Sequence, residues 1–225
     1  MLEQELIWER DVFLLLNGSD SLFWDRFFYG CSYKWTWALL YLALLFVLIY
    51  RRPWKEVLLV VISVVVLIVL CDQLASGICK PLFHRFRPTH HPDFKDIVDI
   101  VGNKRGGLYG FVSSHAANAF GLATFTALLF RNRLFTATIL MFAFLNAYSR
   151  IYLGVHFISD VIAGALLGSL CGYAVFVADK ALRTRIVAEK DKKSSPKSYD
   201  KQQINLFCVI FITTILILTV KSFQS

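Results

Sequence analysis

The sequence contains few of the residues that cross-link or interrupt a fold, with 5 Cys and 5 Pro among 225 residues. No two cysteines form a Cys-x-x-Cys pair, and all but Cys31 lie in apolar runs; the others are Cys71, Cys79, Cys171 and Cys208. Small, buried hydrophobic side chains are therefore the simplest interpretation of the cysteines. Neither a disulfide framework nor a zinc site is indicated.

The chain also lacks the patterns of a cleavable signal peptide and of a nucleic-acid-binding surface. Glu3, Glu5 and Glu9 precede any long apolar run. A signal peptide begins with basic residues instead, so we expect no cleavage. The formal net charge is +8, but no basic groove with stacking aromatic residues is visible. We therefore expect no nucleic-acid partner.

What the chain has in abundance is apolar surface. Hydrophobic residues make up 56% of it, including 20 Phe, which is more than a soluble domain of this size can bury. A bilayer accommodates such a chain as solvent. We therefore predict an all-α fold, a polytopic membrane bundle of six transmembrane helices. The predicted spans are residues 33–50, 57–79, 114–130, 134–148, 157–178 and 204–220.

The predicted organisation has two parts. Residues 1–32 form an N-terminal interfacial amphipathic segment, with a helix over residues 2–16 that ends at Asn17-Gly18. Ser19 or Asp20 is expected to cap a second short helix. This segment lies in the membrane interface or packs on the bundle, and both interpretations stay open. Residues 33–221 form the six-helix transmembrane domain, with a flexible cytoplasmic linker at about 180–203.

Basic residues predict the orientation in the membrane. They follow the first, third and fifth predicted spans: Arg51, Arg52, Lys55, Arg131, Arg133 and the lysines and arginines between 180 and 201. The positive-inside rule places these loops in the cytoplasm. The loops at 80–113 and 149–156 then lie outside. The 80–113 loop also carries six basic residues, which weakens this bias unless they serve a phosphate site.

The outer loops collect the residues most suited to chemistry. All five histidines lie there: His84, His90, His91, His115 and His156. His156 and Asp160 are four residues apart, so we expect them to share a helix face. A carboxylate that accepts one imidazole N–H leaves the other nitrogen free as a nucleophile. A buried pair that merely closes the bundle is the structural alternative.

Two further motifs provide groups that bind phosphate. Lys80 and Arg87 bracket a short segment after the second span, with Pro81 and Pro88 discouraging an uninterrupted helix. Arginine offers a planar fork to phosphate oxygens and lysine a point charge. At the start of the third span, Ser113 or Ser114 is a natural N-cap. The first-turn N–H groups there favour an anion, and His115 is placed to donate a proton.

Together these motifs resemble the type 2 phosphatidic acid phosphatase family, the membrane branch of the vanadium haloperoxidase-like superfamily. That family has the patterns Lys-x6-Arg-Pro, Pro-Ser-Gly-His and Ser-Arg-x5-His-x3-Asp. The first is complete at residues 80–88, and the third is complete at Ser149, Arg150, His156 and Asp160. The second is degenerate, because Val112 and Ser114 replace the Pro and the Gly. The loss of Gly puts the fine geometry around phosphate in doubt.

The resemblance implies a metal-independent lipid phosphatase without a cofactor. His156 attacks phosphorus and forms a phosphohistidine, Asp160 orients it, and His115 protonates the leaving group. The resemblance assigns the phosphate oxygens to Lys80, Arg87, Ser113, Ser114 and Arg150. The enzyme is expected in the cytoplasmic (inner) membrane, with its active site on the periplasmic or extracellular face.

The expected substrate is a phosphorylated membrane lipid. Undecaprenyl diphosphate and lipid A are favoured over phosphatidylglycerol phosphate and phosphatidic acid, because the basic 80–113 loop suits a highly anionic headgroup. A lipid transporter or flippase that binds phosphate without cleaving it is the first alternative. A membrane assembly protein with a decayed site is the second, and a vanadate-dependent oxidase is a third.

Overall fold

A computed structural model describes residues 7–186 and 199–224, and this part of the chain is helical without strands. The main helices are α1 (Ile7–Leu16), α2 (Leu22–Cys31), α3 (Ala38–Ile49), α4 (Trp54–Asp72), α5 (Lys80–Phe83), α6 (Ser114–Phe130), α7 (Arg133–Tyr152), α8 (Ile158–Ile186) and α10 (Lys201–Phe223). Short helices η2 (Lys34–Trp37), η3 (Gln73–Cys79), η4 (Pro88–His90) and η5 (Val101–Asn103) connect them. The predicted all-α class is confirmed.

The longest helices have the length and the composition of membrane spans. Four qualify: Trp54–Phe83, Arg133–Tyr152, Ile158–Arg185 and Lys201–Phe223. A fifth is obtained if α2 and η2–α3, which bend by 66° at their junction, count as one span. Leu166 and Leu170 on α8 are 62% and 69% exposed, as expected of side chains that face lipid. The chain is therefore an integral membrane protein.

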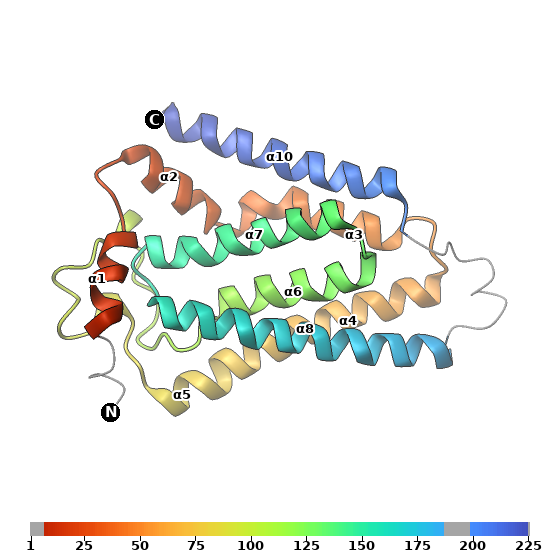
Figure 1. Ribbon diagram of the computed structural model, residues 1–225, viewed down its shortest axis with the longest axis horizontal. Helices are drawn as coiled ribbons and strands as arrows, with labels where there is room; N and C mark the ends of the chain where they lie inside the picture. The colour runs from red at the N-terminus through yellow and green to blue at the C-terminus, as the bar shows by residue number, and fades with distance from the viewer. Residues whose placement is uncertain (1–6, 187–198, 225) are drawn as a thin grey trace.

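Helix α6 lies at the centre of the bundle, packed against α4, α7 and α8 (Figure 1). Gly164, Gly168 and Gly172 place one face of α8 directly on the backbone of α6. A Cβ at Gly168 would lie 2.0 Å from the carbonyl oxygen of Ala117. Small residues spaced by four allow such close helix packing in membranes. This contact fixes the starts of α6 and α8 relative to each other.

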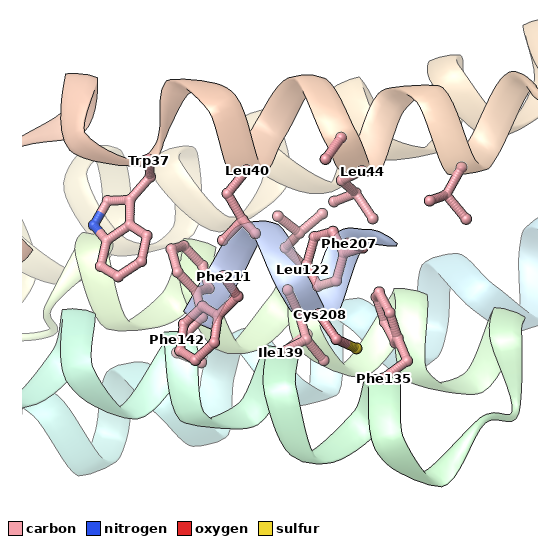
Figure 2. Close-up of a cluster of buried hydrophobic side chains, with 14 of the residues drawn as sticks. Trp37, Leu40, Leu44, Leu122, Phe135, Ile139, Phe142, Phe207, Cys208 and Phe211 are labelled. Atoms are coloured by element: carbon pink, nitrogen blue, oxygen red, sulfur yellow. The ribbon is translucent and has the colours of Figure 1, made fainter. Parts of the chain in front are cut away.

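A second core lies between α3, α7 and α10 (Figure 2). Trp37 and Leu40 come from the η2–α3 segment, Phe142 from α7 and Phe211 from α10. The Trp37 and Phe142 rings meet edge to face at 4.9 Å, and Trp37 stacks on Phe211 at 6.1 Å. Large rings in edge-to-face and stacked contacts bury much apolar area. They attach α10, the last helix, to the rest of the bundle.

The two ends of the bundle differ in what they contain. One end, called here the α1 end, holds α1, α5, the starts of α6 and α8 and the end of α7 (Figure 1). The opposite end holds the starts of α4, α7 and α10. The described residues of the basic loops used for the orientation prediction adjoin the opposite end. The chemistry-bearing motifs all adjoin the α1 end.

The N-terminal helices pack on the bundle. Phe13 of α1 is fully buried, with its ring 6.0 Å from that of Phe94 and 5.2 Å from that of Phe157. The predicted cap of the second helix is wrong, since Ser21 rather than Ser19 or Asp20 precedes α2. Residues 2–6 of the predicted first helix lie outside the described residues.

The predicted linker at about 180–203 is too long. Helix α8 continues to Ile186 and α10 begins at Lys201. Arg183 explains part of this extension. Its Nη2 donates a hydrogen bond to Oδ2 of Asp179, one turn earlier, at 3.1 Å, and such an (i, i+4) pair supports a helix. Asp200 caps α10 by accepting the N–H of Gln202 at 2.8 Å. Residues 187–198 of the predicted linker lie outside the described residues.

Candidate active site

His156 lies in the turn between α7 and α8. Gly154, at φ 71°, lets the chain reverse, which is a conformation that glycine adopts without strain. His156 itself is 1% exposed. The prediction that His156 shares a helix face with Asp160 is wrong, since α8 begins at Ile158. The Asp160 carboxylate accepts a hydrogen bond from the N–H of Phe157 at 3.1 Å. Asp160 therefore caps the start of α8, and the helix does not extend back to His156.

The predicted contact between His156 and Asp160 nevertheless forms. The Nδ1 atom of His156 lies 3.4 Å from Oδ2 of Asp160. On the other side of the ring, Nη1 of Arg87 lies 2.7 Å from Nε2. Arginine can only donate, so Nε2 carries a lone pair and the proton resides on Nδ1, facing Asp160. Burial and the neighbouring cations, above all Arg87, lower the pKa of His156 well below its ordinary value. The imidazole is therefore neutral at neutral pH.

Arg87 is held in place from two directions. Its Nη1 also donates to the carbonyl of Val155 at 2.8 Å, and its backbone N–H donates to the carbonyl of Leu108 at 3.0 Å. The side chain is 8% exposed, and its Nε has no hydrogen-bond partner. Burial lowers the pKa of Arg87 from its ordinary value, a cost that an oxyanion at this place would offset.

Arg85 is a site residue that sequence reasoning missed. Its Nη1 donates to Oδ1 of Asp160 at 2.5 Å and to Oγ of Ser159 at 2.7 Å. Its Nη2 pairs with Oε2 of Glu9 at 3.0 Å. Arg85 thus holds the carboxylate that orients His156. The sequence signal was its position two residues before Arg87, but nothing local indicated its partners.

Glu9 brings α1 into the site. Its side chain is fully buried and accepts hydrogen bonds from the N–H of Ser159 at 2.5 Å and from its hydroxyl at 2.9 Å. Glu9 and Asp160 share one guanidinium, that of Arg85. In the sequence, Glu9 indicates only that a cleavable signal peptide is not expected. A contact across 150 residues leaves no periodic trace in the sequence.

The start of α6 faces Asp160. Ser113 is its N-cap, with its hydroxyl accepting the N–H of Ala116 at 3.4 Å, which decides between Ser113 and Ser114. The N–H of Ser113 donates to the carbonyl of Asp160 at 3.0 Å. The Oγ atom of Ser114 instead accepts a hydrogen bond from Nζ of Lys80 at 2.9 Å. The two serines therefore have different tasks.

Lys80 was predicted to lie just outside the second span. It lies instead within one continuous helix. The π-helix η3 connects α4 to α5, so that Trp54–Phe83 runs without a break. Pro81 does not interrupt this helix; it lies directly after the π-helical segment η3 and close to the helix end at Phe83. Nζ of Lys80 also donates to Oγ of Ser76 at 3.0 Å.

His115 borders a cavity of about 420 Å³ between α3, α4, α6 and α7. Its lining includes polar side chains, namely Asp72, Ser114, His115, Asn118 and Asn146. It also includes apolar side chains such as Val64, Ile68 and Leu122. Oδ1 of Asn118 is buried without a hydrogen-bond partner. His115 is thus open to a bound molecule and lies beside Ser114 at the helix start.

Arg150 completes the set of predicted residues. It is 4% exposed near the end of α7, and its Nη1 donates to Oγ of Ser32, the C-cap of α2. Within residues 7–186 and 199–224, no group of three or more His, Cys, Asp or Glu side chains is placed to hold a metal ion. The predicted residues therefore gather at the α1 end as a cationic site around His156.

Comparison with known proteins identifies the family. Residues 54–183, more than half of the chain, match the PAP2 superfamily. The chain belongs to the PAP2 superfamily. The matched range contains Lys80, Arg87, Arg150, His156 and Asp160, and the phosphatase family predicted from these motifs is confirmed.

Two curated PAP2 relatives cover most of this chain. The lipid A 4'-phosphatase of Porphyromonas gingivalis is 48% identical over 177 residues, which are 79% of this chain and 75% of that protein. The lipid A 4'-phosphatase of Bacteroides thetaiotaomicron is 36% identical over 182 residues, which are 80% of this chain and 81% of that protein. No solved structure matches the chain.

Proposed function

We propose that this protein is a lipid A phosphatase of the inner membrane that works through a phosphohistidine on His156. One observation carries the mechanism: Arg87 donates to Nε2 of His156 while Asp160 faces Nδ1. This arrangement selects the neutral tautomer whose Nε2 lone pair is the nucleophile. The same geometry argues against a transporter that only binds phosphate, because binding does not need an oriented nucleophile.

In the first step, Nε2 of His156 attacks phosphorus. A P–N bond forms as the P–O bond to the lipid breaks, and His115 gives a proton to the departing oxygen. Arg87 leaves Nε2 and binds a phosphoryl oxygen, as do Lys80 and Arg150. Because charge shifts among these oxygens in the transition state, the preformed cations supply the main electrostatic stabilisation.

In the second step, water hydrolyses the phosphohistidine. His115, now neutral and deprotonated, accepts a proton from water as the oxygen of that water attacks phosphorus. The P–N bond breaks, and the electron pair returns to Nε2. Asp160, itself held by Arg85 at 2.5 Å, balances the charge that the imidazole carries between the two steps. Ser113 and Ser114 position phosphate through the first turn of α6.

The identity of the relatives favours lipid A as the substrate and its 4'-phosphate as the group removed. Undecaprenyl diphosphate, phosphatidylglycerol phosphate and phosphatidic acid are the other substrates to test. The cavity beside His115, polar at Asp72 and Asn118 and apolar at Leu122, is suited to an amphiphile whose phosphate binds at the site.

The proposed topology has six crossings, with α6 as the sixth. This helix has 17 residues, or about 26 Å at 1.5 Å per residue, close to the hydrocarbon thickness. The α1 end, with the site, then faces the periplasm, and the basic opposite end faces the cytoplasm. We propose residues 1–32 as an N-terminal segment attached to a catalytic domain over 33–221.

The test is phosphate release by the purified protein in detergent with EDTA. Lipid A labelled separately at its 1- and 4'-phosphates is compared with the three other lipids. We expect release from the 4' position and its loss in His156→Ala. Equal release by His156→Ala would overturn the histidine mechanism, and preference for another lipid would overturn the substrate. Absence of release from every lipid by folded protein would favour the binding-only alternative.

A further inference from the structure

The hydroxyl of Ser32 lies between two cations. Its Oγ accepts hydrogen bonds from Nη1 of Arg150 and from Nζ of Lys104, the latter at 3.0 Å. A serine hydroxyl has two acceptor lone pairs and one donor hydrogen. Since both lone pairs are used, the O–H group is left to donate. Ser32 is 7% exposed, so this donor is fixed in a largely dry environment.

The two cations have no acidic counterpart in the described part of the chain. Neither Arg150 nor Lys104 lies within ion-pair distance of a carboxylate there. Arg150 is 4% exposed, and its Nε has no hydrogen-bond partner. Lys104 otherwise contacts the ring of Tyr29, 5.6 Å from its centroid. A buried cation such as Arg150 is costly without a counter-ion, and the half-buried Lys104 beside it adds a second positive charge, so an oxyanion would stabilise this arrangement.

We propose that Ser32 and Lys104, with Arg150, form an oxyanion subsite that binds the phosphomonoester dianion of the substrate. This inference rests on the proposed function, because Arg150 also belongs to the phosphate-binding motif. Neither Ser32 nor Lys104 belongs to any of the three family patterns. A monoester carries close to two negative charges, whereas a diester carries one. An additional cation therefore selects the monoester.

The subsite has its own pH dependence. Burial and the neighbouring Arg150 lower the pKa of Lys104 to about 8. The groups that face Lys104 are Arg150 from α7, Tyr29 from α2 and, more distantly, His115 from α6. Lys104 is charged below this pKa and neutral above it. Phosphate affinity should therefore weaken as pH rises through about 8, and bound phosphate should raise the pKa of Lys104 in return.

The probe is inorganic phosphate, whose affinity for the purified protein is measured by calorimetry and as a competitive inhibition constant. We expect Lys104→Met to weaken binding about tenfold, because a charge-assisted hydrogen bond is lost. We expect Ser32→Ala to weaken binding about threefold, because an ordinary hydrogen bond is lost. Lys104→Arg should keep the affinity and remove its decline above pH 8. The matched control is Lys95→Met, an exposed lysine of the same loop, which should behave like the wild type.

Unchanged phosphate affinity in Lys104→Met would overturn the subsite. If that variant does not fold, Lys104→Arg decides, because an affinity that still declines above pH 8 in this variant also overturns it. The outcomes separate the subsite from the proposed function. Phosphate release by the wild type with normal binding by Lys104→Met removes the subsite alone. Phosphate binding without release from any lipid removes the proposed function and leaves the subsite in place.

Discussion

The two ends of the bundle both bury charged side chains, but they balance them differently. At the opposite end, Arg183 pairs with Glu56 at 3.2 Å and with Asp179 at 3.1 Å, and Arg52 lies 3.5 Å from Glu56. Two cations there meet two carboxylates. Ser63 adds a hydrogen bond to Asp179 at 3.1 Å. This network is satisfied within the protein, and it ties α4 to α8.

At the α1 end, the carboxylates Glu9 and Asp160 are both taken by Arg85. Within the described residues, no carboxylate pairs with Arg87, Arg150, Lys80 or Lys104. A buried charge without a partner of opposite sign lowers the stability of the fold. The imbalance therefore identifies the end of the bundle that binds an anion, and it predicts opposite consequences of mutation at the two ends.

The largest expected effect is that of Arg87→Met. Loss of a preformed donor to the transition-state charge should lower kcat/KM by about 10³-fold. Removal of an unpaired buried cation should leave Tm unchanged or raise it. Initial rates on lipid A and thermal unfolding in the same detergent check both expectations. A fall in Tm together with activity would mean that Arg87 stabilises the fold, and that the two ends of the bundle do not differ in this respect.

Glu9→Gln should have the next largest effect. The variant keeps the shape of Glu9 but leaves Asp160 as the sole acidic partner of Arg85. Because Arg85 is then no longer shared with Glu9, it neutralises more of the charge of Asp160, and Asp160 stabilises the His156 imidazolium less. We expect kcat to fall about tenfold, which is typical for the loss of an outer-shell partner. KM should stay near that of the wild type, because Glu9 bonds Arg85 and Ser159 and none of the residues proposed to bind phosphate. A rise in KM with unchanged kcat would contradict this positioning role.

Asp179→Asn tests the opposite end. It breaks a buried pair with Arg183 and should cost about 3 kcal/mol of unfolding free energy. Because the network is remote from His156, kcat/KM at a temperature where the variant is folded should stay within about twofold. Denaturant unfolding and initial rates provide the measurement. Large loss of activity in folded Asp179→Asn would show that the two ends are coupled.

The smallest expected effect is on pH dependence. The lowered pKa of His156 means that its nucleophilic form persists to a pH below the ordinary histidine value. The acid limb of kcat/KM should therefore lie below about 6.5. Arg87→Met removes a neighbouring positive charge, so the pKa of His156 rises and this limb moves to higher pH. A limb that stays in place would show that Arg87 does not set this pKa.

The sequence predicts best those features that have a local signature. Each of the six apolar segments is helical, and the spaced motifs bring Lys80, Arg87, Arg150 and His156 to one end. The start of the fifth span was predicted at Phe157, one residue before α8 begins. The position of His156 outside the helix was not predicted, because the cap that Asp160 provides for Phe157 competes with helical spacing.

Long-range partners could not be predicted in the same way. Arg85 with Glu9, and Ser32 with Arg150, are separated by 76 and 118 residues, and no periodicity connects them. The close contact of α6 and α8 did have a signal that was missed, namely Gly164, Gly168 and Gly172 at intervals of four. The degenerate second motif keeps its helix cap at Ser113, whereas Ser114, in place of the Gly, has acquired a contact with Lys80.

The most direct test of the account is to trap the phosphorylated intermediate. The protein would be mixed with lipid A carrying labelled phosphate, quenched in base within milliseconds and digested with trypsin. Residues 151–180 form one peptide, in which His156 is the only histidine. Label that survives base and is lost in acid is expected on this peptide, and no label is expected in His156→Ala. Phosphate release without any label on this peptide would contradict the phosphohistidine mechanism.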